Sequence, residues 1–388
     1  MVLTAKLHCN EAKTEKANAQ KEFKMSTVKA KNDVKFVGVD DGHSGTKVFA
    51  GYDAVTKQPI QAKIHSIVKK GETNFTSANA QDLDDATIIV DGVVYVVGSK
   101  FGGLGDDIVT NNYPTSGHNI ALIAQALRGF TEAWGGKPVE ISIVTGLPLG
   151  HYFDKKTNKK NEELVQRKIE NVERLSKSYS PADGTKPMFK VVQNKVQPEG
   201  WGSLLDVILD EKGLPVERYD IIEEFGAVVI DIGGRTVDAM IIQSEVMSPE
   251  YDDIHTYDLG VLNLFTDLGN EIMQAEGGRK PPKRHKLEEV IATGSYGRAG
   301  NEQRDYSALV ERMLNNHVAL ILEQLKSIIN SPESEGGIIV TGGGAALFGD
   351  KIKARLSETN PQTEVVIPHD PVFSNARGFW KIARKPNQ

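Results

Sequence analysis

Residues 228–238 constrain the fold of this chain more than any other segment. They read V-V-I-D-I-G-G-R-T-V-D, so an apolar run ends in Asp231 and is followed by two glycines, Arg235, Thr236 and a second aspartate. An apolar run of this length, bounded by glycines, predicts a buried strand. A Gly-Gly turn after it lets backbone N–H groups approach a phosphate closely, and Asp231 is placed to hold a magnesium ion, usually through water. A plain strand and hairpin with an acidic cap has the same pattern, so that interpretation stays open for this segment alone.

The composition is typical of a soluble globular protein with room for two domains. The chain has 388 residues, of which 39% are hydrophobic and 25% charged, and both fractions are ordinary. The net charge of −6 disfavours a general nucleic-acid coat. The single cysteine, Cys9, excludes an intrachain disulfide framework and a cysteine-rich metal site. No apolar run has membrane-spanning length and the first residues lack the apolar core of a secretory signal, so we expect a soluble, cytoplasmic protein.

Residues 1–33 differ from the rest of the chain. They are polar, rich in Lys, Glu and Ala, and short of branched apolar residues. This composition predicts a flexible N-terminal arm, either a frayed helix or a disordered segment. An uncommitted leader is favoured over a specific interaction arm, and the folded pattern begins at Val34.

A second hairpin with an acidic turn is predicted near residue 40. Apolar residues flank the string D-D-G-H-S-G-T-K, which predicts a strand, a tight turn and a second strand. The backbone amides of such a turn can wrap a polyphosphate, while Lys47 neutralises charge and Asp40 faces the metal. The segment is not a Walker A loop, because the G-x-x-x-x-G-K-[ST] order is absent and a strand follows the turn. An ordinary Asp-Gly hairpin with a solvated lysine fits this segment equally well.

Two further predicted strands end in polar or glycine-rich loops. Residues 139–145 form a buried strand followed by T-G-L-P-L-G, and ligands of open α/β sheets collect at the carboxyl ends of strands. Glu199 lies in the loop Q-P-E-G-W-G-S, between a strand over 189–196 and an apolar helix start at 204–209. From this loop it can orient or deprotonate a water molecule. A surface carboxylate in a Pro-Gly turn is the simpler interpretation of the loop by itself.

Glycines and basic residues mark the last third of the sequence. Residues 338–347 read I-I-V-T-G-G-G-A-A-L, a buried strand that leads into a triple-glycine turn. Three glycines permit the backbone to pass flush against a flat ring or a ribose. The basic segment 279–286 is a solvated loop in its simplest interpretation, or it lies over a nucleotide base or an acidic partner. An aromatic helix is expected over residues 375–383.

The ordered set of motifs resembles the superfamily of actin, sugar kinases and heat-shock chaperone ATPases. Its first phosphate motif is similar to residues 40–47, its second to residues 231–238, and its adenosine motif to residues 338–346. The strings T-G-L-P-L-G-H-Y-F-D and I-D-I-G-G-R-T-V-D, with the acidic residue of V-Q-P-E-G, most resemble the plasmid-segregation actins of the ParM/StbA type. Archaeal actin-like proteins are close behind.

This resemblance implies an α/β, actin-like two-domain fold. Two related ribonuclease-H-like halves, each with a smaller subdomain, would surround a nucleotide cleft. Domain I would span residues 34–205, with the first phosphate motif and the connecting region. Domain II would span residues 206–369, with the second phosphate and adenosine motifs. Residues 370–388 would form a C-terminal helix that returns to domain I.

The resemblance also implies ATP and Mg²⁺ as cofactors and assigns roles to individual residues. Asp40 and Asp231 would bind the magnesium shell, and Glu199 would position the attacking water, with Asp231 as its catalytic partner. Arg235 stands where relatives often have a small residue or Thr, so it either adds a phosphate contact or reaches solvent. The nucleotide-binding positions are Asp40, Gly42, Ser44, Gly45 and Lys47 in the first turn, Gly233, Gly234, Arg235 and Thr236 in the second, and Gly342, Gly343 and Gly344 at the adenosine.

The function implied is an ATPase that polymerises head-to-tail into filaments and segregates plasmid DNA. Its partners would be further copies of itself and a DNA-binding adaptor protein, with no membrane involved. A sugar or small-acid kinase of the same superfamily is the main alternative, although the sequence contains no persuasive candidate for its carboxylate base and leaves only Asp238 open. A non-segregating cytoskeletal actin homologue is another. A membrane-adaptor scaffold is disfavoured, because no clear amphipathic membrane helix stands at either end.

Overall fold

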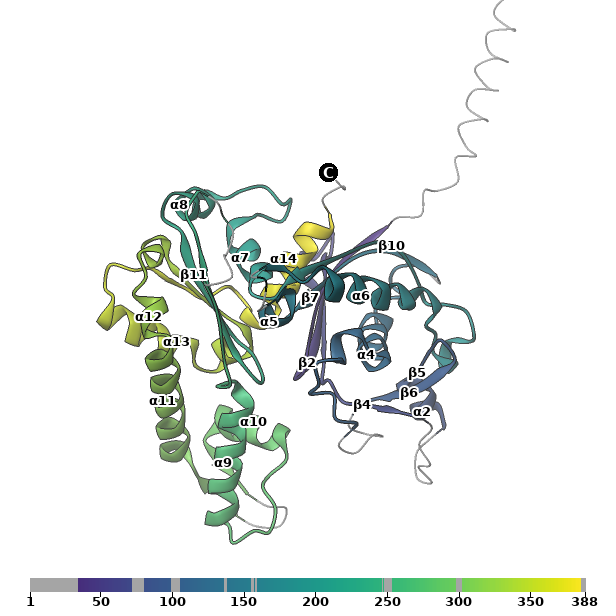
Figure 1. Ribbon diagram of the computed structural model, residues 1–388. Helices are drawn as coiled ribbons and strands as arrows, with labels where there is room; N and C mark the ends of the chain where they lie inside the picture. Colours follow the sequence, from purple (N-terminus) through teal and green to yellow (C-terminus); the bar gives the residue numbers. More distant parts are fainter. Residues whose placement is uncertain are drawn as a thin grey trace, which may run out of the picture. The chain divides into compact units, whose positions relative to one another are not determined.

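The computed structural model describes residues 34–71, 80–98, 105–135, 138–154, 157, 159–245, 247, 253–297 and 302–384. Residues 1–33, for which the sequence predicts an arm, lie outside the described residues. The elements named below all belong to one unit, Lys35–Gln388 (Figure 1).

The first sheet is built around the hairpin predicted near residue 40. Its strands are β1 (Lys35–Gly42), β2 (Gly45–Tyr52), β3 (Pro59–Ile64), β7 (Val139–Leu147) and β10 (Phe189–Pro198). They follow the order β10-β7-β1-β2-β3. β1 pairs antiparallel with β2 and parallel with β7, which pairs parallel with β10. The predicted hairpin is confirmed, and Asp40 lies opposite Lys47 in its register.

The second sheet repeats this plan around the stretch that the sequence singles out. Its strands are β11 (Ala227–Ile232), β12 (Val237–Ile242), β13 (Ile254–Tyr257), β16 (Ile338–Thr341) and β17 (Val365–Val366). They follow the order β13-β12-β11-β16-β17. β11 pairs antiparallel with β12 and parallel with β16, as β1 does with β2 and β7. In this hairpin Asp231 lies opposite Asp238.

Helices and short strands complete the unit. The longer helices are α4 (Gly117–Arg128), α6 (Glu162–Glu173), α7 (Trp201–Ile208), α8 (Glu217–Phe225), α9 (Val261–Ala275), α10 (Arg284–Thr293), α11 (Ser307–Gln324), α13 (Gly342–Thr359) and α14 (Ser374–Ala383). A small sheet in the order β4-β6-β5 consists of β4 (Val68–Lys70), β5 (Thr87–Val90) and β6 (Val93–Val97). Shorter pieces are α2 (Ala80–Ala86), α5 (Leu149–Tyr152), α12 (Lys326–Ile329), β8 (Phe153–Asp154), β9 (Lys159–Lys160), β14 (Ser295–Tyr296) and β15 (Arg304–Asp305).

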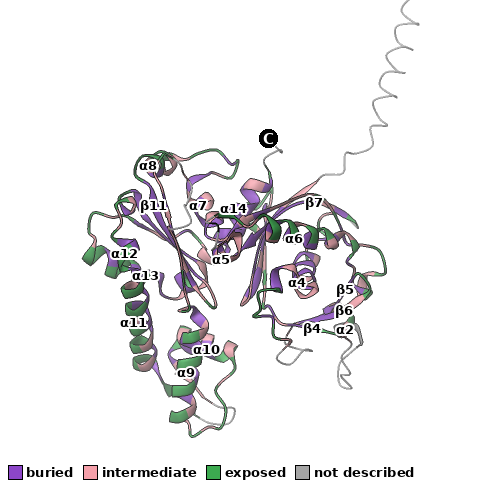
Figure 2. Cartoon of the chain, viewed as in Figure 1, coloured by how far each residue is buried: buried purple, intermediate pink, exposed green. Residues whose placement is uncertain are grey.

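β11 is buried on both faces, which explains its continuous apolar sequence (Figure 2). Val228, Ile230 and Ile232 belong to the hydrophobic core that also contains residues of α9, α11 and α13. Ala227 and Val229 point the other way, into a cluster with residues of α7. Because successive side chains of a strand alternate between faces, a strand covered on both sides needs apolar residues at every position.

The triple glycine differs from its prediction. Residues 342–344 are the first turn of α13 rather than an open turn, and Thr341 stands at its N-cap position. Gly342 alone has the backbone conformation that favours glycine, with φ of 87°. Gly344 is buried, and a Cβ there would overlap the side chain of Ile232. The sequence predicted a turn whose backbone passes flush against a flat ring or a ribose, whereas Gly344 serves the close packing of α13 on β11.

The C-terminal helix packs backbone to backbone on its neighbours. The helix predicted over residues 375–383 is confirmed as α14, which contacts α7, β1, β2 and β7. A Cβ added to Gly378 would overlap the carbonyl oxygen of Gly202 in α7, and a Cβ added to Gly38 in β1 would overlap that of Ala376. Glycines therefore allow α14 to lie directly against both elements, as Figure 1 shows in yellow.

We expect Gly378→Ala to lower the free energy of unfolding by about 1–3 kcal/mol, because the added methyl group forces α14 away from α7. Gly129→Ala is a matched control, since Gly129 has φ of −58° and its Cβ would meet nothing within 4 Å. That substitution should stabilise the protein by about 0.4–1 kcal/mol. Urea denaturation of both variants measures the difference, and equal stability of the two would contradict the close approach.

Candidate functional site

A cavity of about 330 Å³ lies where the two acidic hairpins face each other. This volume is in the range of small-molecule sites in proteins. Its wall contains the turns that follow β1 and β11, the loop before α7 and the first turn of α13. The predicted site residues that line it are Asp40, Gly42, Ser44, Lys47, Glu199, Asp231, Gly233, Gly234, Arg235, Thr236, Gly342 and Gly343.

Two predicted residues are absent from the cavity wall that the described residues form. Gly45 is buried at the start of β2, where a Cβ would lie 3.1 Å from the carbonyl oxygen of Ile64. Gly344 faces Ile232 inside the second half. Both glycines therefore occupy crowded positions next to the site rather than open ones within it.

The first hairpin brings an aspartate and a lysine together. Asp40 is 7% exposed, accepts a hydrogen bond from the N–H of Gly42 at 3.2 Å, and pairs with the Lys47 ammonium at 3.2 Å. Burial by itself lowers the pKa of Lys47, but the carboxylates of Asp40, Glu199 and Asp231 outweigh it and raise that pKa above its ordinary value. Lys47 is therefore firmly charged and faces the cavity.

The second hairpin supplies an acidic side chain with no lysine opposite it. Asp231 is buried and accepts a hydrogen bond from the Asn375 amide at 2.7 Å. Burial, followed by the charge of Asp40, raises the pKa of Asp231 to about 7. Asp238, its neighbour in the register, accepts hydrogen bonds from the hydroxyls of Thr236 at 2.7 Å and Thr256 at 2.6 Å. The Thr236 hydroxyl is thus engaged within the turn.

The two turns touch each other across the cavity. A Cβ added to Gly234 would overlap the side chain of Ser44. Arg235, next in the chain, lines the cavity, but its side chain is 53% exposed and its Nε lies 3.9 Å from the Asp258 carboxylate. A ligand in the cavity is therefore enclosed by backbone from both halves, with Arg235 at its rim.

Glu199 lies on the first-half side of the cavity. Its backbone N–H donates to the carbonyl of Leu147 at 2.8 Å, and its side chain covers Gly146, where a Cβ would lie 2.9 Å from Glu199 Cγ. Burial, then the charges of Asp40 and Asp41, raise the pKa of Glu199 well above its usual range. Perturbed carboxylates in a cavity are typical of functional sites.

A buried lysine, which the sequence analysis missed, supports the first turn. Lys168 of α6 is 0% exposed, and its ammonium lies 2.5 Å from Asp41 and 2.9 Å from the Asn119 side-chain oxygen. The Asn119 amide also donates to Asp41. The available signal was spacing, because Lys168 lies between Val165 and Val172 on the buried face of α6.

The cavity wall also contains a residue of the basic segment 279–286, whose role the sequence left open. The basic stretch 279–286 ends in α10, and Arg284 at the start of that helix lines the cavity. Its Nε donates to Glu288 at 3.0 Å, and its guanidinium lies 5.5 Å from the centre of the Phe265 ring. Arg284, Glu288 and Phe265 form a wall with an aromatic ring and a cation, both of which suit a flat ligand.

Among the described residues, no group of three or more His, Cys, Asp and Glu side chains is arranged to hold a metal ion by itself. In the same part of the chain, no helix is long and apolar enough to span a lipid bilayer.

Two protein families match successive parts of the chain. Residues 38–202 match the family described as "Actin like proteins N terminal domain", and residues 229–354 match "Archaeal actin homologue MreB-like, C-terminal". An archaeal actin homolog of Thermoplasma volcanium is 28% identical over 270 residues, which cover 68% of this chain and 74% of the relative.

Solved structures share the fold. The archaeal actin homolog Ta0583 in complex with ADP has a TM-score of 0.65 and 23% identity, with 89% of this chain and 98% of that chain covered. A 15-stranded ParM filament from Clostridium botulinum has a TM-score of 0.64 and 18% identity, over 90% and 99% of the two chains. The predicted α/β, actin-like fold of two related halves is confirmed, and the chain belongs to the actin-like superfamily.

Proposed function

We propose that the protein binds and hydrolyses ATP and polymerises head-to-tail into filaments, which serve plasmid DNA segregation. The observation that carries this proposal is the contact of two acidic glycine turns, one from each sheet, around a cavity that contains Lys47 and Asp231. Two relatives agree with it, since one is a complex with ADP and the other a filament.

The residues present fit a magnesium ion bound together with a nucleotide. Asp40 and Asp231 are buried carboxylates that line the cavity, and Lys47 pairs with Asp40 at 3.2 Å. Mg²⁺ characteristically takes one or two carboxylates and completes its shell with water and phosphate oxygens. The lack of a self-sufficient metal cluster among the described side chains is consistent with that mode. When bound, the ion would neutralise charge on the phosphate oxygens.

The remaining residues have distinct roles in this proposal. Lys47 offsets the negative charge of the phosphate chain, and Glu199 holds a water molecule in line with the terminal phosphate. The N-terminus of α13 accommodates the adenosine, where Gly343 faces open space. Arg284 and Phe265 would cover the base from the other side.

Filament assembly follows from the two-sided site. We propose a first domain over residues 34–205, a second over 206–369, and a terminal helix within 370–388 that returns to the first. A nucleotide that contacts both domains stabilises the arrangement in which they close on it. If only that arrangement has complementary ends, the subunits associate head-to-tail in an open helical series.

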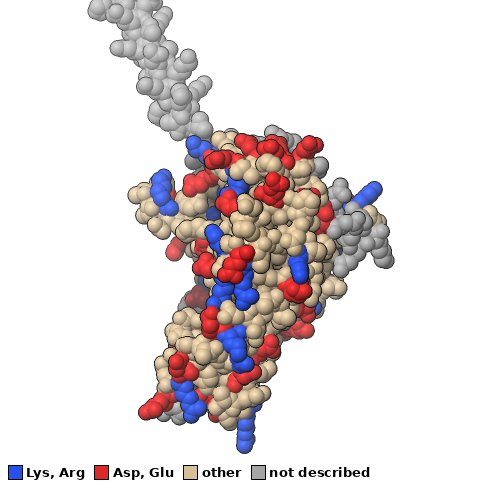
Figure 3. Space-filling view, turned by 90° about the vertical axis from the view of Figure 1, so that its left-hand side faces the viewer, with Lys and Arg blue, Asp and Glu red and all other residues tan. Residues whose placement is uncertain are grey.

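The proposed partners are further copies of the chain and a DNA-binding adaptor protein in the cytoplasm. On the face that Figure 3 shows, acidic and basic side chains are interspersed rather than gathered into a basic surface. The whole chain has a net charge of −6. A face of mixed charge on an acidic chain is a poor match for DNA itself. An adaptor would therefore supply the DNA contact.

Light scattering with negative-stain electron microscopy tests the central proposal. We expect filaments to appear when ATP and Mg²⁺ are added, and scattering to fall as ATP is consumed. The absence of polymer over a wide range of protein concentration, together with sugar-dependent release of ADP, would instead favour the kinase. Asp238, which is held by two threonine hydroxyls, would then be the candidate base.

We expect Glu199→Ala to slow ATP hydrolysis about 10²-fold or more while filaments still form, because the side chain aligns water without holding the nucleotide. Glu140→Ala is the control. Glu140 lies in β7, in the sheet whose strand β10 precedes Glu199, and it pairs with Lys190 at the surface. Phosphate release and sedimentation measure the two effects. Normal hydrolysis by the Glu199 variant would remove this residue from the mechanism.

The raised pKa of Asp231 makes a prediction for the protein without nucleotide and metal. A carboxyl group whose folded-state pKa is about 7 contributes stability below its unfolded pKa and loses that contribution as pH rises through 7. Asp231→Asn removes this loss and retains an oxygen that accepts from Asn375. The melting temperature of the variant should therefore exceed that of the wild type at pH 8, and the two should converge at pH 4. A pH-independent difference in the presence of EDTA would refute the assignment.

A further inference from the structure

One buried amide connects the two halves of the site from behind. Asn375, near the start of α14, is 4% exposed and does not line the cavity that the described residues form. Its Nδ2 donates to Asp231 at 2.7 Å. Its Oδ1 accepts from the N–H of Gly200 at 2.9 Å, and from the N–H and hydroxyl of Ser203 at 3.1 and 3.0 Å. The amide thus contacts the carboxylate of one half and the residue that follows Glu199 in the other.

The oxygen of Asn375 caps α7 from another part of the chain. The first N–H groups of a helix have no partner within the helix, and a side chain at the N-cap position commonly accepts from them. Gly200, the N-cap of α7 with φ of 80°, has no side chain to do so. Asn375 supplies the missing acceptor and fixes the backbone next to Glu199.

The chemistry of these contacts determines which group can stand here. The two N–H donors require an acceptor on one side, and the Asp231 carboxylate requires a donor on the other. An amide meets both requirements, whereas a carboxylate would put a second negative charge against Asp231. An aliphatic side chain would leave all of these polar groups without their partner.

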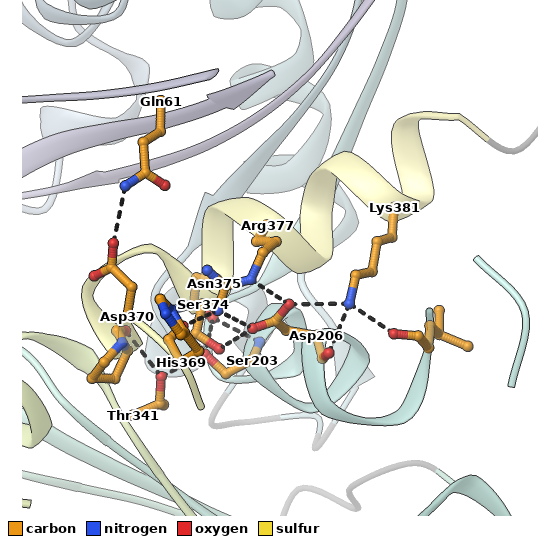
Figure 4. Close-up of polar contacts among 12 residues, drawn as sticks. Gln61, Ser203, Asp206, Thr341, His369, Asp370, Ser374, Asn375, Arg377 and Lys381 are labelled. Carbon is orange, nitrogen blue, oxygen red and sulfur yellow. Dashed lines mark hydrogen bonds and ion pairs between the residues drawn. The ribbon is translucent and has the colours of Figure 1, made fainter. Parts of the chain in front are cut away.

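Neighbouring residues of α14 attach this helix to α7 through the Asp206 carboxylate. Asp206 of α7 is 4% exposed at its side chain and accepts from Ser374 at 2.9 Å, from Arg377 at 2.6 and 2.7 Å, and from Lys381 at 3.1 Å. Figure 4 shows these side chains along one side of α14. Because several residues of α14 bind one carboxylate of α7, the two helices form a rigid pair.

We propose that Asn375 is a positioning residue that couples Glu199 to Asp231, so that the water-orienting group of one half and the metal-binding carboxylate of the other keep a fixed relation. The inference rests on the proposed ATPase function. It implies that replacing Asn375 changes the rate of hydrolysis more than it changes the affinity for nucleotide, because the glycine turns and Lys47 remain intact.

Asn375→Asp tests the coupling with almost no change in shape. It keeps the oxygen that caps α7 and replaces the donor to Asp231 by a second carboxylate oxygen. We expect kcat for ATP hydrolysis to fall about 10²-fold, because small misplacements of catalytic groups have effects of this size. The Kd for nucleotide should stay within about threefold of the wild-type value, because the groups that bind the nucleotide are intact. Ser374→Ala is the matched control, because it loosens α14 from Asp206 without touching the amide, and its kcat should stay near that of the wild type.

A second measurement is independent of activity. In nucleotide-free protein, Asn375→Asp should lower the melting temperature. Adding Asp231→Asn to that variant should raise its melting temperature by more than Asp231→Asn raises the melting temperature of the wild type. The coupling would be overturned if the two substitutions had additive effects on the melting temperature. It would also be overturned if Asn375→Asp lost no more kcat than Ser374→Ala at equal stability. If the wild type does not hydrolyse ATP, the proposed function fails while the melting temperatures still decide whether Asn375 couples to Asp231.

Discussion

The concentration of acidic side chains around one cavity is the constraint on which the rest of the structure depends. Asp40, Glu199 and Asp231 reach it at the carboxyl ends of β1, β10 and β11. Asp40 and Asp231 are buried, and Glu199 is partly buried. Like charges held together in a poorly solvated space are costly unless each has a partner. The cavity wall also contains the cations Lys47, Lys63, Arg235 and Arg284. The magnesium ion of the proposed ligand would add positive charge beside Asp40 and Asp231.

The two halves meet this constraint in different ways. In the first hairpin, the register sets Lys47 opposite Asp40, so the counter-charge is part of the motif. In the second, the same position holds Asp238, so the register sets no cation opposite Asp231. The second half relies on neutral donors instead, namely two threonine hydroxyls for Asp238 and the Asn375 amide for Asp231. The two halves thus share the backbone plan of the turn, whereas the charge balance of the second half depends on other residues.

This difference also explains how far the sequence could be interpreted. The hairpins, their acidic ends and their glycine turns are local, and β11 is recognisable because burial on both faces makes it apolar throughout. The partners of the carboxylates are not local. Lys168 lies 127 positions from Asp41, and Asn375 lies 144 positions from Asp231, so no spacing rule connects them. The packing role of Gly344 was missed for a related reason, because Gly344 is small to accommodate Ile232, a neighbour that only the fold reveals.

The last helix of the chain therefore completes the site as well as the fold. α14 lies against β1 at Gly38 and against α7 at Gly202, and its Asn375 binds Asp231. These contacts join one strand from the first sheet, the helix that follows Glu199 and one strand from the second sheet. Before α14 docks, Asp231 lacks its hydrogen-bond donor and the N-terminus of α7 lacks its acceptor. A folding intermediate that has both sheets but not α14 would contain all the predicted site residues without the relation between Glu199 and Asp231. The relation between Glu199 and Asp231 is thus a property of the fully folded chain rather than of either sheet alone.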